Sequence, residues 1–240
     1  MRFMFDFLAV SWRSFLNIIL PNCCLHCDVA INDRGVFLCN KCLKSLPYTN
    51  YHLYPFDNEL VSLLNKSVNI HSAIAMCYFS DDNMMHNIIH LLKYKDMSKL
   101  GYFLGETYGD ILVDFDFVRR YDVIVPIPLH KSRLNQRGYN QSEMIARGLA
   151  SRLEIDVDTD SVMRIVNTTS QTSKNAEERM RDMQGAFKVV KPSNLNSKHL
   201  LLVDDVVTTG STMISCAREI LKSCRRVKVS VCSICRTCSC

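Results

Sequence analysis

The chain has 240 residues, of which 48% are hydrophobic and 22% charged, and its formal net charge is +5. This composition excludes an intrinsically disordered protein, and the length allows one ordinary hydrophobic core plus a small accessory module. The mild positive charge permits an anionic ligand or a nucleic acid as partner and requires neither.

The first segment, residues 1–20, is apolar but contains three charged side chains, Arg2, Asp6 and Arg13. Its uninterrupted apolar stretches are too short to span a bilayer, and Arg13 lies where a signal peptide has its apolar core. Apolar side chains recur at helical spacing, which predicts an amphipathic helix packed on the protein. Contact with a membrane surface is the alternative. Because no export signal is found, we expect a cytoplasmic protein.

Two Cys-x-x-Cys pairs define the next segment, residues 21–50: Cys24 with Cys27, and Cys39 with Cys42. Two such pairs complete the tetrahedral shell of a zinc ion, and four thiolates leave no open position for a substrate. The segment therefore predicts a structural Zn²⁺ module. The alternatives are Cys23 in place of Cys24, His26 as a ligand, or four reduced cysteines in a small core.

The remaining residues, 51–240, form the predicted main domain, which contains two helices before its first conspicuous strand. Apolar spacing over residues 84–92 predicts an amphipathic helix, and residues 100–111 predict a second one. The basic segment 93–95 between them can contact nucleic acid by charge and stacking, or can simply complement the dipole of its own helix.

A buried strand is predicted within residues 121–130, where it is ended by prolines, and a basic polar loop follows over residues 131–140. Three cations of this loop are candidate phosphate donors: Lys131, Arg133 and Arg137. A solvated loop without a ligand is the alternative. Strand, loop and following helix together predict one anion site.

The helix after the basic loop begins at a predicted capping box. Asn140 is the expected N-cap and Glu143 the expected reciprocal partner. Ile145, Leu149 and Leu153 then provide the apolar face.

A second candidate anion site follows the apolar run at residues 200–203, which reads as a strand that delivers Asp204 and Asp205. A short turn leads into a helix with an apolar face over residues 214–224. The turn and helix start are Thr208, Thr209, Gly210, Ser211 and Thr212. Free N–H groups and the positive dipole end favour a phosphate there, and the carboxylates can bind hydroxyl groups or Mg²⁺. In the alternative, both acids are surface residues and Thr208 or Thr209 caps the helix.

A second group of cysteines lies near the C-terminus: Cys232, Cys235, Cys238 and Cys240. In sequence alone it looks similar to the first cluster. Alternating valines predict a final strand that continues through Cys235. Residues three apart in a strand point to opposite faces, so this group is not predicted to bind a metal. The last two cysteines are expected on a frayed tail.

The string over residues 200–212 resembles the signature of type I phosphoribosyltransferases: four apolar residues, two acids, two apolar residues and Thr-Thr-Gly-x-Thr. That family binds 5-phosphoribosyl-1-pyrophosphate (PRPP) at the signature. The resemblance implies that Asp204 and Asp205 bind the ribose and that residues 208–212 surround the 5′-phosphate, with Mg²⁺ bridging pyrophosphate and ribose oxygens.

Nearly the whole chain, from about Pro21 to Arg236, is similar to the ComF family of competence-associated proteins. The similarity is found in Pro21-x-x-Cys24-x-x-Cys27, Val125-Pro-Ile-Pro-Leu-His130, Arg137-Gly-Tyr-Asn-Gln141, and Arg164, Gln171, Arg179 and Gly185-Ala-Phe187. Asp182 departs from the Asn that the family often has at that position, and the cysteines of the final strand are also unusual. The resemblance implies an α/β, type I phosphoribosyltransferase-like fold: a mainly parallel sheet flanked by helices, with a small N-terminal zinc module.

The resemblance also implies what the protein does: it binds PRPP or another phosphorylated ribose and serves competence and DNA uptake. In phosphoribosyltransferases, loops in the region of residues 160–198 usually cover the active site, so Arg164, Gln171 and Arg179 are candidates to close over pyrophosphate. Any reaction would displace pyrophosphate at the anomeric carbon, with charge stabilisation by Lys131, Arg133, Arg137 and Mg²⁺. No residue pair identifies a general base. The alternative is a non-catalytic adaptor that binds single-stranded DNA or proteins of the competence machinery.

Overall fold

The computed structural model describes residues 22–33, 35–94, 97–166 and 185–237. The predicted N-terminal helix over residues 1–20 lies outside the described residues. The same is true of Gln171, Arg179, Asp182, Cys238 and Cys240. The chain divides into two compact units, Met1–Leu46 and Pro47–Cys240, whereas the sequence prediction placed the border after residue 50.

The first unit is built around the cysteine pairs. Strands β1 (Asn22–Cys23) and β2 (Ala30–Ile31) pair antiparallel, and the short helix α2 (Asn40–Lys44) follows. Among the described residues of this unit, the buried hydrophobic ones are Cys24, Leu38, Cys42 and Leu46. Half of them are cysteines, so the cysteine pairs make up much of its interior.

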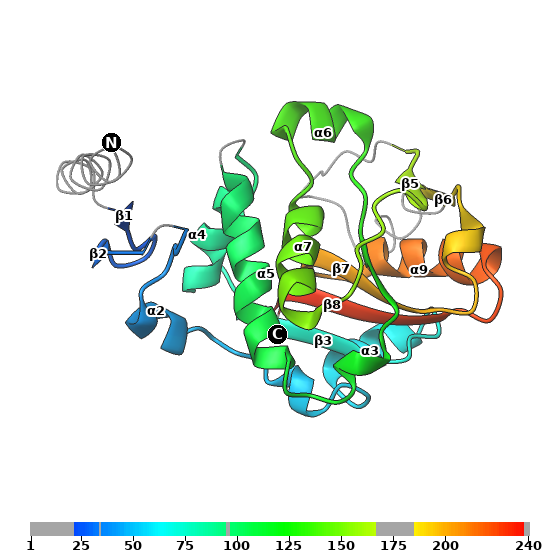
Figure 1. The fold of residues 1–240 in the computed structure, drawn as a ribbon, viewed down its shortest axis with the longest axis horizontal. Helices are drawn as coiled ribbons and strands as arrows, with labels where there is room; N and C mark the ends of the chain where they lie inside the picture. The colour runs from blue at the N-terminus through cyan, green and yellow to red at the C-terminus, as the bar shows by residue number, and fades with distance from the viewer. Residues whose placement is uncertain (1–21, 34, 95–96, 167–184, 238–240) are drawn as a thin grey trace, which may run out of the picture. The chain divides into compact units, whose positions relative to one another are not determined.

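The second unit is an α/β domain on a four-stranded parallel sheet with the order β3-β8-β7-β4 (Figure 1). The strands are β3 (Ala73–Phe79), β4 (Val123–Pro126), β7 (His199–Val207) and β8 (Lys228–Thr237). Runs of buried residues in all four strands fit a sheet that is covered on both faces. The predicted fold class is confirmed.

Helices cover both faces of this sheet. One face contacts α3 (Glu59–Asn65) and α9 (Ser211–Ser223), whose apolar residues share one core cluster with alternate strand residues such as Leu200 and Leu202. The other helices that contact the sheet have no residue in that cluster and therefore cover the opposite face. They are α4 (Met84–Leu91), α5 (Ser98–Leu112) and α7 (Gln141–Leu153). The described residues of this unit also include short 3₁₀ turns at Tyr51–Leu53, Val118–Arg120 and Pro192–Asn194.

Helices α5 and α7 lie side by side and touch through glycine (Figure 1). A Cβ atom at Gly105 would lie 2.2 Å from the Ile145 carbonyl oxygen, and one at Gly148 would lie 2.1 Å from the Tyr102 carbonyl oxygen. Both clashes are with backbone, which cannot move aside as a flexible side chain can. The close approach of these helices, and with it the position of α7 on the sheet, therefore depends on two glycines.

The prediction of a basic loop over residues 131–140 is wrong, because most of this segment is helical. Residues Lys131–Arg137 form helix α6, which begins at the N-cap His130 and ends at Gly138 with φ +80°. None of the α6 residues is buried, so the segment lacks the apolar periodicity from which a helix is predicted.

The predicted capping box of α7 is half right. The Asn140 side chain accepts a hydrogen bond from the Ser142 N–H at 3.2 Å. Glu143 forms an ion pair with Arg147 instead of reaching back to the N-cap, with a shortest N–O distance of 2.8 Å. One turn of helix separates Glu143 from Arg147, so a local ion pair at this spacing takes the place of the reciprocal bond of the box.

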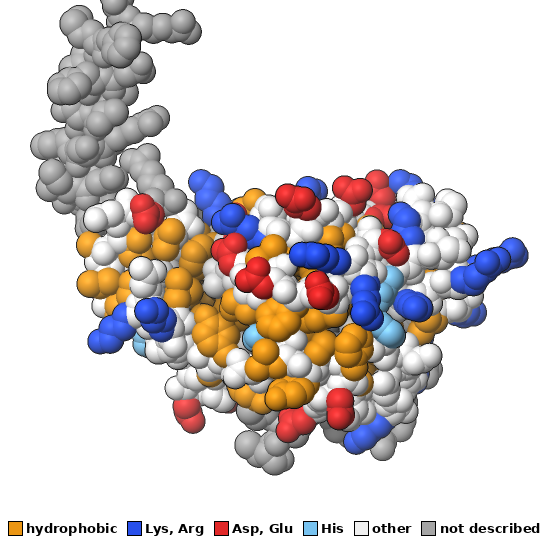
Figure 2. Space-filling view, turned by 60° about the horizontal axis from the view of Figure 1, so that its bottom comes forward, with side chains coloured by type: hydrophobic (Ala, Val, Ile, Leu, Met, Phe, Trp, Pro, Cys, Tyr) orange, Lys and Arg blue, Asp and Glu red, His pale blue; other side chains and the backbone are white. Residues whose placement is uncertain are grey.

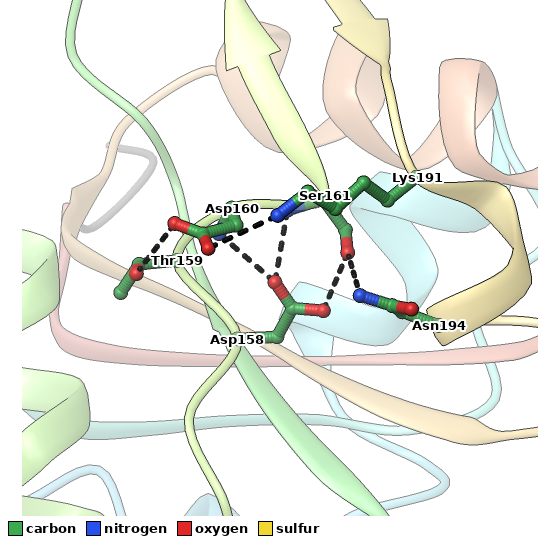
Figure 3. Close-up of polar contacts among 6 residues, drawn as sticks. All are labelled: Asp158, Thr159, Asp160, Ser161, Lys191 and Asn194. Atoms are coloured by element: carbon green, nitrogen blue, oxygen red, sulfur yellow. Dashed lines mark hydrogen bonds and ion pairs between the residues drawn. The ribbon is translucent and has the colours of Figure 1, made fainter.

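A two-stranded hairpin, β5 (Val162–Arg164) with β6 (Phe187–Val189), is inserted between α7 and β7. Asp158 ties its base (Figure 3) by accepting the backbone N–H groups of Asp160 and Ser161, each at 2.9 Å. On the far side of the hairpin, Lys191 pairs with Asp160 at 3.2 Å, and the Asn194 amide donates to the Ser161 hydroxyl at 3.2 Å. Hydrogen bonds and an ion pair thus hold the two ends of the hairpin together where they join the main domain.

The amino end of the sheet holds a buried polar network. The Ser230 hydroxyl contacts His199 Nε2 at 2.8 Å and accepts from the Ser72 hydroxyl at 2.7 Å. Ser72 in turn lies 3.1 Å from the Tyr121 hydroxyl. Burial, followed by the nearby charges of His71 and Lys228, lowers the pKa of His199 to about 4. His199 is therefore a neutral part of the core at physiological pH.

Candidate functional site

The site lies where two neighbouring strands send their connections in opposite directions. From β4 the chain passes through α6 and α7 to Val157, which bridges Ile124 on the edge of β4 away from β7. From β7 it passes through α9 to β8, on the other side. Parallel sheets bind ligands outside the carboxyl ends of the strands at such a switch point. Both segments predicted to bind anions, the residues after β4 and the residues after β7, begin there.

The connection from β7 to α9, residues 208–212, is here called the phosphate loop. Gly210 is the N-cap of α9 with φ +76°, a backbone conformation that favours glycine. No side chain caps the helix, which contradicts the alternative reading of Thr208 or Thr209 as N-cap. The Thr209 and Ser211 hydroxyls lie 2.7 Å apart. The first turn of α9 therefore presents backbone N–H groups without a side-chain cap, as an anion site requires.

Asp204 is held by groups from two elements. Its Oδ1 accepts from the Ser142 hydroxyl at 2.8 Å and from the Asp205 N–H at 3.0 Å. Burial and then repulsion by Asp205 raise the pKa of Asp204 to about 8, against the opposing effect of the Ser142 bond. Binding of a cation or of ribose hydroxyl groups next to it would favour the ionised form.

Helix α6 contains all three predicted pyrophosphate-binding cations and places two of them on one face. Arg133 and Arg137 are one turn apart and therefore share a face of the helix. Burial and then the charge of Arg137 lower the pKa of Arg133. Like charges at this spacing repel, so this face favours an anion that neutralises both. Lys131 is exposed and lies on a different face of the helix.

Arg164 of β5 joins the same group from the hairpin. Its guanidinium lies 5.6 Å from the centroid of the Phe187 ring. Burial and then the charge of Arg133 lower the pKa of Arg164, while the Asp204 carboxylate opposes that shift. These interactions bring β5, α6 and β7 into one electrostatic neighbourhood, although the three residues are far apart in sequence.

The block Tyr139-Asn-Gln141 fixes the connection between α6 and α7. The Tyr139 hydroxyl and the Gln141 amide both donate to the Leu92 carbonyl, at 2.6 and 2.9 Å. The Asn140 amide donates to the Ile127 carbonyl just after β4, at 3.0 Å. These side chains therefore position the basic helix over the carboxyl end of the sheet.

Two residues of the site were not found from the sequence. Ser142 holds Asp204, and Arg236 of β8 donates through Nη1 to the Thr208 carbonyl at 3.0 Å. Nothing local distinguishes Ser142 from the other polar residues of its helix. Arg236 offered a signal, because it is a charged residue after a run of apolar and small residues, Val229–Cys235.

The predicted metal ligands Cys24, Cys27, Cys39 and Cys42 come together in the first unit, with all four sulfur atoms within 4.8 Å of one another. The Cys27 and Cys39 sulfurs are 3.7 Å apart, close to the roughly 3.8 Å that tetrahedral Zn–S bonds of about 2.3 Å require. Burial acts to raise the pKa of Cys24, but backbone N–H groups around the sulfur lower it to about 6. The donor set therefore fits a structural zinc ion.

Neither Cys23 nor His26 belongs to this cluster, which is the one such group found among the described residues. Cys232 and Cys235 lie in β8, buried, as the strand prediction required. Cys232 lies opposite Ile74 and Val203 on the neighbouring strands, and Cys235 lies opposite Cys77 and Val206, so both act as small core residues.

Comparison with known proteins agrees with this architecture. A phosphoribosyl transferase domain model matches residues 140–239, from the start of α7 to the end of β8. DNA utilization protein YhgH of Escherichia coli (strain K12) is 33% identical over 156 residues, which cover 62% of this chain and 66% of that protein. The match thus spans slightly less than two thirds of the length of YhgH.

Two further relatives match over most of their length. Competence protein F of Haemophilus influenzae is 25% identical over 220 residues, and competence protein ComFC of Bacillus subtilis is 25% identical over 235 residues. Each match covers 86% of this chain and 92% of the relative. The four-cysteine module, the phosphoribosyl transferase domain match and these relatives together support a ComF-family phosphoribosyltransferase-like protein.

Proposed function

We propose that this protein binds PRPP, or another phosphorylated ribose, in the crevice between the carboxyl ends of β4 and β7. The observation that supports this best is the convergence of carboxylates, an uncapped helix start and an arginine pair at a topological switch point. A phosphate, two hydroxyls and a pyrophosphate are the groups that such a set would bind together.

The roles follow from the chemistry of each group. Asp204 and Asp205 bind the ribose hydroxyls, and the phosphate loop (Thr208, Thr209, Gly210, Ser211 and Thr212) binds the 5′-phosphate. Arg133 and Arg137 bind the pyrophosphate, to which Lys131 adds a positive charge from its own face of α6. A magnesium ion would be held mainly by ligand oxygens, because Mg²⁺ usually keeps phosphate and water ligands.

If the protein is an enzyme, the reaction is displacement at the anomeric carbon. The bond from this carbon to the pyrophosphate oxygen breaks, and a bond to a nucleophilic acceptor forms. The arginines of α6 would stabilise the charge on the leaving pyrophosphate. No side chain is assigned as general base, and the acceptor is left open.

The biological setting proposed is competence and DNA uptake, because relatives are named competence proteins and a DNA utilization protein.

The second candidate function is a non-catalytic adaptor for single-stranded DNA or for competence proteins. On the face drawn in Figure 2, Lys and Arg side chains are interspersed with Asp and Glu side chains, so that face offers no continuous basic track. A cytoplasmic location belongs to the PRPP-binding proposal. No helix among the described residues is long and apolar enough to cross a membrane.

The proposal is tested by calorimetric titration with PRPP in the presence and absence of Mg²⁺. Replacing Asp204→Asn and Asp205→Asn together should weaken PRPP binding by roughly 10-fold or more, because charge-assisted hydrogen bonds contribute about 1.5–3 kcal/mol each. Asp160→Asn, on the hairpin base, is the control and should bind PRPP normally. A folded double variant with unchanged affinity would rule out the site.

Turnover separates the two candidate functions. Incubation with PRPP and a panel of nucleobases, orotate and amines should release pyrophosphate if the protein is a transferase. An adaptor would leave PRPP intact and bind single-stranded DNA with an affinity that falls steeply as salt rises.

We further propose that the four-cysteine cluster holds one zinc ion that folds the first unit. Cys39→Ser should lose the metal and cause this unit to unfold, since structural zinc supplies folding free energy directly. Cys23→Ser is the matched control and should keep one zinc per chain. Metal analysis of the purified full-length protein decides between these outcomes, and a metal-free wild-type protein with freely titratable thiols would contradict the proposal.

A further inference from the structure

Arg236 is a buried cation beside the phosphate loop. The strand register places it opposite Val207, the last residue of β7, and its side chain is 3% exposed. Nη1 donates to the Thr208 carbonyl, but the buried Nε has no hydrogen-bond partner. Within the described part of the chain, no carboxylate forms an ion pair with this guanidinium.

Such an arrangement is costly in a protein without a ligand. Taking a charge out of water is unfavourable unless an opposite charge and hydrogen bonds compensate for it, and an unmet buried donor adds to the cost. One carbonyl oxygen compensates only in part. What the guanidinium lacks is a negative charge close to the phosphate loop, whose Thr208 carbonyl it contacts.

We propose that Arg236 is a positioning residue whose charge is matched by the phosphate of the bound ligand. Its Nη1 fixes the first peptide of the phosphate loop, and its positive charge adds to the attraction of the α9 N-terminus for the phosphate. In the ligand-free protein the residue contributes little to stability or opposes it. This inference rests on the proposed function, because it assumes that a phosphorylated ribose binds this loop.

The test compares stability and affinity in the same full-length variants. Arg236→Met removes the charge and the donors, Arg236→Gln keeps a donor without charge, and Arg236→Lys keeps the charge. Arg225→Gln, an exposed residue between α9 and β8, controls for the lost unit of net charge. Each protein is melted without ligand and titrated with ribose 5-phosphate and with inorganic phosphate.

We expect Arg236→Met to melt at the same temperature as the wild type or higher, and to bind ribose 5-phosphate at least 10-fold more weakly. Arg236→Gln should lose nearly as much affinity, Arg236→Lys only a few-fold, and Arg225→Gln none. This combination of unimpaired stability and lost affinity is not expected of a purely structural arginine.

Two results would overturn the inference. One is an Arg236→Met protein that melts well below the wild type or does not fold, because the buried charge would then stabilise the ligand-free fold. The other is unchanged affinity in folded Arg236→Gln. If the wild type itself binds neither PRPP nor ribose 5-phosphate, the proposed function fails instead, and the melting comparison still decides whether the buried charge opposes stability.

Discussion

The two ends of the parallel sheet both hold buried polar groups, but they use them differently. At the amino end, Ser72, Ser230, His199 and Tyr121 bond to one another. At the carboxyl end, Asp204 Oδ1 accepts two hydrogen bonds, and Arg236 donates through Nη1 while its buried Nε has no hydrogen-bond partner. A closed network stabilises the fold, whereas under the proposed function the open one is completed by the ligand.

The largest expected effect comes from disrupting the close contact between α5 and α7, which sets the position of α7 on the sheet. Gly148→Val should destabilise the protein by at least about 3 kcal/mol, because the new side chain meets the Tyr102 backbone of α5 and cannot be accommodated by rotation. Denaturant unfolding followed by circular dichroism measures this. Lys222→Val is the control, since it places the same side chain at an exposed position of helix α9. A Gly148→Val protein as stable as the control variant would disprove the close helix contact.

A matched pair of serine substitutions sharpens the contrast between the ends. Ser230→Ala leaves His199 and Ser72 without their shared partner, so it should lower the unfolding free energy by about 2 kcal/mol and leave ribose 5-phosphate affinity unchanged. Ser142→Ala releases Asp204 and should mainly weaken ligand binding. Thermal unfolding and calorimetry on both proteins give the comparison. If Ser230→Ala mainly weakened ligand binding and Ser142→Ala mainly lowered the unfolding free energy, the contrast between the two ends of the sheet would be wrong.

Within the carboxyl end, two further variants separate pyrophosphate from 5′-phosphate. Arg137→Ala should weaken PRPP binding roughly 10-fold, about 1.4 kcal/mol, and leave ribose 5-phosphate binding nearly unchanged, because only PRPP contains the pyrophosphate. Gly210→Val should weaken both, since a β-branched side chain is strained at φ +76° and obstructs the loop. Calorimetric titration with each ligand checks this. Equal losses for both ligands in Arg137→Ala would assign α6 to another partner, with nucleic acid as the first to test.

The two ends should also differ in the sign of their pH dependence. The pKa of His199 is lowered from its ordinary value of 6.5 to about 4, so the unfolded chain binds a proton first, and the stability contributed by neutral His199 is lost as pH falls from about 6.5 to 4. The pKa of Asp204 is raised from 3.8 to about 8, so its contribution is lost as pH rises between those values.

Unfolding free energies from pH 4 to pH 8 test both signs. His199→Gln should flatten the acid side of the curve, and Asp204→Asn should flatten the loss toward pH 8. The surrounding charged groups, Lys228 and Asp122 near His199 and Asp205 and Arg164 near Asp204, remain in each variant. A curve unchanged by either substitution would show that these residues titrate normally in the folded protein.

Sequence patterns predicted what is local and missed what depends on distant contacts. The cysteine spacing, the strand before Asp204 and the glycine at the start of α9 each act within a few residues, and the structure confirms their arrangement. Helix α6 was missed because it buries no residue. Its placement depends on Tyr139 and Gln141 bonding to a carbonyl 47 and 49 residues away in sequence.

The polar partners of the site show the same limit. Ser142 and Asp204 are 62 residues apart, and Arg236 meets the Thr208 carbonyl only because β8 lies beside β7. No spacing rule predicts such pairs, since the register of a parallel sheet is set by helices packed on both faces.

The bonded base of the hairpin has a consequence for how this protein can diversify. Because Asp158, Asp160 and Ser161 meet Lys191 and Asn194 at one point, the segment between them behaves as an insertion with its ends already joined. Changing the length of such an insertion adds little closure entropy. Relatives with segments of other lengths at this point would keep the same sheet and phosphate loop. The domain can therefore change at the hairpin while the remainder is inherited intact.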